Sequence, residues 1–160
     1  MSILNNFIYK SVITTIYKFR KIYWRLIKPI TSGVRCLIFN ENNQVLLVKH
    51  FYSNEWYLPG GAINYKESPQ KALLRELREE CGIYNLIDLK QLNVYTNNFE
   101  SKKDTIFLFT AYCEKTDVKF NFEIENIKFF NLDNLPNLTS IGTRKRIEEF
   151  QSQKFNNSIW

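Results

Sequence analysis

The sequence predicts one domain of the layered α/β class. The chain has 160 residues, of which 44% are hydrophobic, and a chain of this length normally buries a single core. Five short apolar runs typical of strands are interspersed with two longer segments of helical periodicity. Strands that are interspersed with long helices favour a sheet covered by helices.

The first two predicted strands form a hairpin. Apolar runs occupy residues 34–39 and 44–51, and the turn residues Glu41, Asn42 and Asn43 join them. Further apolar runs predict the remaining strands, at 89–96, 104–113 and 127–130.

Two segments carry helix signals. Ser68 can cap a helix, Pro69 suits its first position, and Gly82 is a residue that often follows a last turn. Apolar residues between them recur at helical spacing, so we predict a helix over residues 69–81. Residues 139–150 begin with a Thr or Ser that can cap, and they predict a second helix.

Three glutamates crowd the last turns of the first predicted helix. Glu76, Glu79 and Glu80 stand at i, i+3 and i+4, so they share one face. Like charges at this spacing cost about 0.2–0.5 kcal/mol per pair, and each anion near a helix C-terminus costs about 0.3–1 kcal/mol. One interpretation is a solvated acidic face that Arg75 and Arg78 relieve. The other is a site for a hard cation such as Mg²⁺, which takes oxygen ligands; zinc is disfavoured because the face has no His or Cys.

The residues around these glutamates favour the cation. Gly60 and Gly61 lack a Cβ, so the backbone there can approach an ion or a phosphate closely. Residues 61–83 resemble the Nudix box, and every fixed position of that motif is filled. The fixed positions are Gly61, Glu67, Arg75, Glu76, Leu77, Glu79, Glu80, Gly82 and Ile83. The resemblance extends more loosely from about Gly33 to Pro136.

The resemblance implies a fold and a division of the chain. It implies a Nudix-type α/β/α sandwich with a mixed β-sheet, and we expect residues 31–155 to form this Nudix hydrolase domain. Residues 1–30 lie outside it and are expected to form a basic amphipathic helical extension. Within them, residues 3–27 repeat apolar side chains at spacings of one, three and four, opposite a face of lysines and arginines.

The resemblance also implies the roles of the motif residues. Glu67 and Arg75 would form a structural salt bridge that fixes the loop to the helix. The cofactor would be Mg²⁺, with Mn²⁺ able to substitute, and water would attack phosphorus in a nucleoside diphosphate linked to another moiety. The implied metal ligands are Gly61, through its carbonyl, Glu76, Glu79 and Glu80.

The general base stays open between several carboxylates. Members of the family use either a glutamate of the box or a carboxylate from a later loop. Glu123 and Glu125 are the later candidates here, with Glu125 slightly favoured, and the alternative interpretation makes both of them surface residues. The candidate catalytic residues are therefore Glu76, Glu79, Glu80 and Glu125.

Four further residues are candidates for substrate contacts. Arg35 interrupts an apolar strand, and a buried charge needs a partner. His50 ends a predicted strand near the motif. It could contact a phosphate, but a surface position is the favoured interpretation. Trp56 and Tyr57 directly precede the motif and could stack on a base, with core or rim packing as the favoured alternative.

The substrate is not selected by any residue that we can identify. Family members that act on ADP-ribose usually carry a proline downstream of the box, and this chain has none between Pro69 and Pro136, so ADP-ribose is not the expected substrate. Nucleoside triphosphates, dinucleoside polyphosphates and nucleotide sugars all stay open. Alternative functions are RNA cap pyrophosphohydrolysis and a non-catalytic nucleotide-binding or regulatory module, although such modules usually lose box glutamates.

The charge distribution bears on partners. The net charge is +6, but six of the 22 Lys and Arg lie in residues 1–30 without any acid, and residues 31–160 are neutral, so DNA binding is not expected. The extension could contact an anionic membrane surface, at about 1 kcal/mol per basic residue, a second copy in a homodimer, or the Nudix domain. Three cysteines without metal spacing indicate a reducing compartment. We therefore expect a cytoplasmic protein. The alternative is a peripheral position at the inner face of a membrane.

Overall fold

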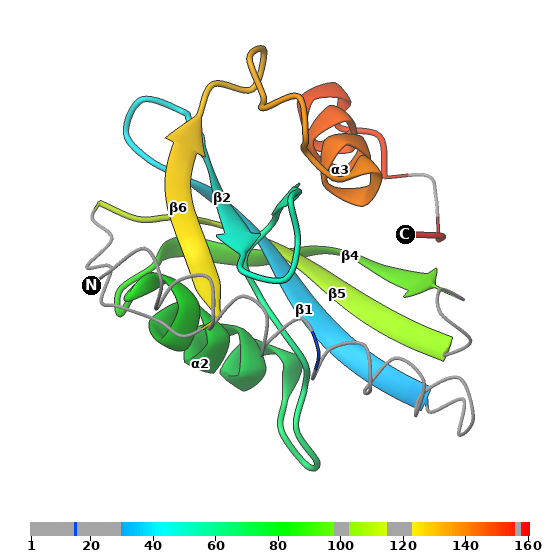
Figure 1. Cartoon of the computed structure of the whole chain (residues 1–160). Helices are drawn as coiled ribbons and strands as arrows, with labels where there is room; N and C mark the ends of the chain where they lie inside the picture. Colours follow the sequence, from blue (N-terminus) through cyan, green and yellow to red (C-terminus); the bar gives the residue numbers. More distant parts are fainter. Residues whose placement is uncertain (1–14, 16–29, 98–102, 115–122, 156–157) are drawn as a thin grey trace, which may run out of the picture.

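Figure 1 shows the computed structural model of the chain, which describes residues 15, 30–97, 103–114, 123–155 and 158–160. The described part has the predicted mixed α/β fold, with one six-stranded sheet and two helices. The predicted amphipathic helix of the N-terminal extension lies outside the described residues. Within them, no helix is long and apolar enough to cross a membrane.

The sheet is mixed. Its strands are β1 (Ile30–Phe39), β2 (Val45–His50), β3 (Trp56–Tyr57), β4 (Ile87–Asn97), β5 (Lys103–Tyr112) and β6 (Ile124–Phe130). The order is β3-β2-β1-β5-β4, and β6 also pairs with β2. The β1–β5 pair is parallel, whereas the other pairs are antiparallel. Five strands match predicted ones, and β3 was missed because two residues carry no periodicity.

The gap between β1 and β2 positions the motif loop. The two strands pair at Phe39 and Val45, and farther along β1 the loop after β3 takes the place of β2. There the Val34 N–H donates to the Gly61 carbonyl at 2.9 Å, and the Cys36 N–H donates to the Pro59 carbonyl at 3.0 Å. These backbone bonds hold the start of the motif against the centre of the sheet.

The first predicted helix is confirmed as α2 (Pro69–Cys81). The Ser68 side chain accepts a hydrogen bond from the Lys71 N–H, and Gly82 takes the left-handed conformation with φ 63°. Leu73 and Leu77 are fully buried, so the apolar face turns to the core as expected. Glu80 is buried on the same side as these leucines, whereas Glu79 is mostly exposed.

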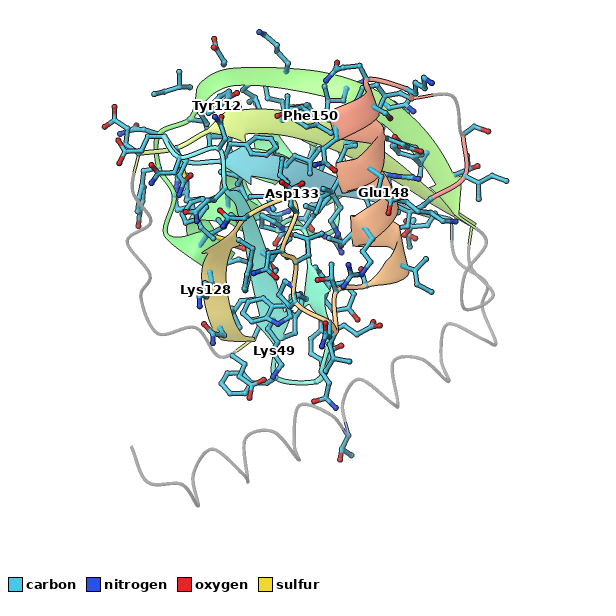
Figure 2. The ribbon with its side chains drawn as sticks, turned by 90° about the horizontal axis from the view of Figure 1, so that it is seen from above. Lys49, Tyr112, Lys128, Asp133, Glu148 and Phe150 are labelled. Carbon is cyan, nitrogen blue, oxygen red and sulfur yellow. The ribbon has the colours of Figure 1, made fainter. Side chains whose placement is uncertain are left out.

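The helices lie on opposite sides of the sheet (Figure 1). One core cluster joins α2 to alternate residues of β1, including Val34 and Cys36. The other joins the second helix, α3 (Ile141–Ser152), to the opposite face of β1. In that cluster the rings of Phe150 and Phe39 stack with centroids 4.9 Å apart (Figure 2). All three cysteines are buried and unpaired.

The last described segment, residues 158–160, pairs with β4. The Thr96 N–H donates to the Ser158 carbonyl at 2.7 Å, and the Trp160 N–H donates to the Thr96 carbonyl at 3.0 Å. Gly142 of α3 leaves room for the indole, because a Cβ there would lie 2.5 Å from Trp160 Nε1. The segment therefore covers part of an edge strand.

Candidate active site

Gly60 begins the site because only a residue without a side chain fits its conformation. Its φ is +134°, and a Cβ at this position would overlap the Val34 carbonyl oxygen. In this conformation the Gly60 N–H donates to Glu80 Oε2 at 3.0 Å. The loop thus fixes the carboxylate at the end of α2 by a backbone bond.

Gly61 makes room for a second carboxylate. A Cβ at Gly61 would overlap the Glu76 carboxyl group, which lies against the backbone at this point. The Gly61 carbonyl, an expected metal ligand, accepts the Val34 N–H, which leaves one lone pair for an ion. The two glycines of the loop therefore hold two different glutamates of the helix.

Arg75 links the motif loop to the helix through Glu67. Its Nε donates to Glu67 Oε1 at 3.0 Å and its Nη2 to Glu67 Oε2 at 2.9 Å, a two-bond arrangement that Arg and carboxylate favour. Nη2 also donates to the Ala62 carbonyl at 2.9 Å, and Glu67 accepts the Asn64 N–H at 3.0 Å. The Arg75 hydrogen bonds lower the pKa of Glu67, and Glu67 raises the pKa of Arg75 in return.

Glu67→Gln is expected to lower stability more than it lowers kcat. The reason is that Glu67 fixes the loop to the helix through Arg75 and is not one of the expected metal ligands. We expect the effects of Glu67→Gln and Arg75→Gln on stability to be coupled, because each removes the same pair. Denaturant unfolding of Glu67→Gln, Arg75→Gln and the double variant measures this coupling. Strictly additive free energies of unfolding would show that the pair contributes nothing as a pair.

The same guanidinium also binds two box glutamates. Arg75 Nη1 donates to Glu76 Oε1 at 2.8 Å and to Glu79 Oε2 at 3.3 Å. Glu79 keeps 58% of its side chain exposed, whereas Glu76 keeps 15%. A positive group therefore already stands between two carboxylates, and it offsets the repulsion that their spacing creates.

Glu80 is the buried member of the trio, with 7% of its surface exposed. Burial raises the pKa of Glu80 to about 8, and the charges of Glu76 and Glu123 act in the same direction. The Gly60 N–H and the Arg35 guanidinium oppose this rise in pKa. Because the ionised form of Glu80 is disfavoured in this way, a nearby cation would stabilise that form strongly.

Glu80→Gln is expected to raise the melting temperature of the metal-free protein at alkaline pH. Folding raises the pKa of Glu80 from 4.5 to about 8, so the folded state binds more protons between these pH values and stability falls as pH rises. Glutamine removes this loss and can still accept the Gly60 N–H. Melting in EDTA should show equal stability near pH 4.5 and a gain of at least about 1 kcal/mol at pH 8–9. A difference that is independent of pH would contradict the assignment.

The donor set fits a hard divalent cation. Glu76, Glu79 and Glu80 offer only oxygen atoms, and the loop carbonyl of Gly61 adds another. In the present side-chain arrangement no three His, Cys, Asp or Glu of the described residues converge on one point. The reason is local, because Glu79 is turned to Arg75 and Glu80 to Gly60.

The two late carboxylates have different surroundings. Glu125 pairs with Lys49 of β2, with Oε2 and Nζ 3.1 Å apart. Glu123 precedes β6, its carbonyl accepts the Phe51 N–H at 3.0 Å, and its charge acts on Glu80. Of the two candidates, Glu123 is thus the one whose charge reaches the box.

Burial lowers the pKa of His50, and the positive charge of Arg35 lowers the pKa of both His50 and Glu80. The expectation of a surface histidine is wrong, since His50 is 6% exposed. Its ring stacks on Tyr52 with centroids 4.8 Å apart. The Tyr57 ring, from β3, also packs against it with centroids 5.8 Å apart.

The two aromatic candidates occupy different layers. Trp56 packs edge-on against Phe130, with ring centroids 4.9 Å apart, in the cluster that contains α3. Tyr57 belongs to the α2 side, and its hydroxyl donates to Glu55 Oε2 at 2.7 Å. The packing role therefore describes Trp56 better than base stacking does.

Sequence reasoning missed one contact of the site. Tyr52 was not considered, although an aromatic residue two positions after His50 was a visible signal. The bond from Arg75 to Glu79 agrees with the expectation that Arg75 relieves the acidic face, since i,i+4 pairs of opposite charge commonly interact on helices.

Comparisons with known proteins identify the family to which the chain is similar. The family model described as NUDIX domain matches residues 29–150. An RNA pyrophosphohydrolase of Acinetobacter baylyi is 46% identical over 51 residues, which cover 32% of this chain and 31% of that protein. Another RNA pyrophosphohydrolase, from Wolbachia sp. subsp. Brugia malayi, is 29% identical over 144 residues, covering 75% and 89%. The solved MutT protein from Methanosarcina mazei Go1 has a TM-score of 0.70 at 25% identity, covering 81% and 98%.

Proposed function

Because the chain belongs to the Nudix family, we propose that it hydrolyses a pyrophosphate bond in a nucleoside diphosphate linked to another moiety. The reaction would depend on a divalent cation, Mg²⁺ with Mn²⁺ as a substitute. The observation that carries this proposal is the glycine loop, which holds Glu80 by a backbone bond and leaves space for Glu76. The loop therefore keeps both carboxylates beside the motif backbone, where they would be available to a cation.

The residues of the site would have the following roles. Glu76, Glu79, Glu80 and the Gly61 carbonyl would hold the cation. A bound cation would supply charge neutralisation on the phosphate oxygens and would lower the pKa of a bound water. The Glu67–Arg75 pair keeps the loop and helix in register, so that these ligands are in place before substrate arrives.

We propose Glu123 as the general base, in preference to Glu125. The negative charge of Glu123 acts on Glu80, whereas Glu125 is held by Lys49. Glu123 would accept the proton of the attacking water. Glu123→Gln is therefore expected to lower kcat by about 10²–10⁴-fold, and Glu125→Gln by much less. Steady-state kinetics at saturating substrate measures this, and the reverse order of effects would restore Glu125.

RNA pyrophosphohydrolysis is the second candidate activity. It is also cleavage of a pyrophosphate bond, and four of the matched relatives are named for it. A non-catalytic module is disfavoured because all box glutamates are present. Residues 31–160 carry equal numbers of basic and acidic residues, which does not favour RNA over a small nucleotide.

A substrate panel with purified protein tests the proposal. The panel holds nucleoside triphosphates, dinucleoside polyphosphates, nucleotide sugars, ADP-ribose and 5′-triphosphorylated RNA, each with Mg²⁺, Mn²⁺ or EDTA. We expect hydrolysis of at least one compound with a metal and none in EDTA, and ADP-ribose is not expected to be the best. Absence of hydrolysis throughout, or activity that persists in EDTA, would refute the proposed function.

A further inference from the structure

The first turn of α3 is bonded to the segment that leads into the motif loop. Ser140 is the N-cap of this helix, and its side chain accepts the N–H of Thr143. The Ser140 N–H donates to the Trp56 carbonyl at 3.0 Å, and the Trp56 N–H donates to the Leu138 carbonyl at 2.8 Å. The Thr143 hydroxyl oxygen accepts the Leu58 N–H at 3.2 Å. Strand β3 and the residue after it are therefore held by the start of a helix from much later in the chain.

These bonds replace some that a helix start normally makes within itself. In a capping box the residue at N3 sends its side chain back to the N–H of the N-cap. In α3 the N-cap N–H bonds to Trp56, and the N3 residue is Thr143, whose hydroxyl accepts the Leu58 N–H instead. The Ser140 hydroxyl completes the arrangement by donating to Thr143 Oγ1 at 2.9 Å. The polar groups of this turn therefore serve the segment before the loop as well as their own helix.

The contact between Leu58 and Thr143 lies in the interior. Leu58 is 1% exposed and Thr143 is 2% exposed. Buried N–H groups are nearly always paired, and one that loses its acceptor is destabilising. Because solvent offers the Leu58 N–H no ready substitute, the position of this amide depends on the Thr143 hydroxyl.

A single proline separates Leu58 from the first glycine of the loop. Pro59 has no N–H and a fixed φ, so the backbone donors on either side of it are those of Leu58 and Gly60. The first bonds to Thr143 of α3, and the second bonds to Glu80 Oε2 of α2 at 3.0 Å. The two helices lie on opposite sides of the sheet (Figure 1), and this tripeptide connects them. A shift of Leu58 would therefore move the amide that orients Glu80.

We propose that Thr143 is a positioning residue for the metal site. By accepting the Leu58 N–H, it fixes the short peptide whose Gly60 N–H orients Glu80. This role rests on the proposed function, in which Glu80 is a ligand of the cation. It places a determinant of cation affinity on α3, the helix that carries none of the proposed ligands.

Binding of Mn²⁺ without nucleotide tests this role apart from turnover. The electron paramagnetic resonance signal of free Mn²⁺ gives the dissociation constant of each protein. Thr143→Val keeps the shape and removes the hydroxyl, and Thr143→Ala also removes it, so the test does not depend on the folding of one variant. Thr143→Ser keeps the hydroxyl.

The matched control is Thr110→Val. Thr110 is also a buried threonine, and its hydroxyl donates to the Leu37 carbonyl at 3.2 Å. This bond joins β5 to β1 within the sheet and does not involve the motif loop. The control therefore makes the same substitution and removes a bond of the same kind at another place.

We expect Thr143→Val and Thr143→Ala to weaken Mn²⁺ binding by about 3–10-fold. This is less than the roughly 10–100-fold that is typical when a group bonded directly to a metal ligand is lost. Thr143→Ser should recover wild-type affinity because it keeps the acceptor. Thr110→Val is expected to lower the melting temperature and to keep the affinity. In turnover, Thr143→Val should raise the Mg²⁺ concentration for half-maximal rate, with little change in KM of the panel substrate at saturating Mg²⁺.

Three outcomes would overturn the positioning role. The first is wild-type Mn²⁺ affinity in Thr143→Val and Thr143→Ala despite a lower melting temperature, which would make Thr143 a structural residue only. The second is an equal loss of affinity in Thr110→Val, and the third is a loss in Thr143→Ser as large as that in Thr143→Val. If the wild type binds Mn²⁺ and hydrolyses a panel compound while the Thr143 variants bind normally, the proposed function stands and the positioning role alone fails. Wild-type protein that neither binds Mn²⁺ nor hydrolyses any compound would refute both.

Discussion

Replacing Glu80 or Glu79 by glutamine is expected to reduce kcat by about a hundredfold or more. Each change removes one negative charge from the group of carboxylates that would hold the cation. Glu80→Gln preserves shape, because the amide oxygen can accept the Gly60 N–H that the carboxylate now accepts. Glu79 is mostly exposed and bonds to Arg75 at 3.3 Å, so Glu79→Gln is expected to leave the fold intact.

The measurement is kcat with Mg²⁺ on the substrate that the panel identifies, with melting curves of each variant in EDTA. Glu55→Gln is a useful control, because Glu55 is an exposed carboxylate that bonds to the Tyr57 hydroxyl and not to the box. We expect the control to retain kcat within about threefold. Full activity of Glu79→Gln or Glu80→Gln would remove that residue from the proposed ligand set.

Gly61→Ala is expected to lower kcat by about 10–100-fold with little change in melting temperature. The added Cβ would overlap the Glu76 carboxyl group, and a flexible side chain can move away more easily than the backbone can. The fold is therefore kept while one proposed ligand is displaced. In a Glu76→Ala background the same change should have almost no further effect, because the group it displaces is already absent.

Gly142→Ala is the matched control for this experiment. Its Cβ would meet the Trp160 indole at 2.5 Å on α3, on the other side of the sheet from α2. We expect a lower melting temperature and an unchanged kcat, the reverse of the pattern for Gly61→Ala. Additive losses of kcat from Gly61→Ala and Glu76→Ala would show that the glycine acts on something other than Glu76.

The elements with local signals could be predicted from the sequence. The bounds of α2 follow from Ser68, Pro69 and Gly82, whose capping and turn preferences act within a few residues. The second helix begins at Ile141, directly after Ser140, which is one of the two predicted caps, and it ends at Ser152, two residues beyond the predicted segment. Strand β3 has no local signal, because it exists only through pairing with β2.

The candidate site divides in the same way. The pairing of Glu67 with Arg75 could be expected, because both belong to one motif of fixed spacing. The burial of His50 could not, since the Tyr57 ring that packs against it comes from β3, a strand without a local signal. The effect of the Arg35 charge on Glu80 likewise needs the loop after β3 to lie along β1.

The parallel pairing of β1 with β5 has a consequence for the order of folding. Each residue of β1 pairs with a residue of β5 that stands 73 positions later, as in the bond from Thr110 Oγ1 to the Leu37 carbonyl. Contacts of such long range close slowly. On the ribosome, α2 is complete well before β5, the strand that pairs with the second edge of β1. A nascent chain that pauses before residue 103 exposes one edge of β1 and an open apolar face, which makes this interval the one most exposed to aggregation and to chaperone capture.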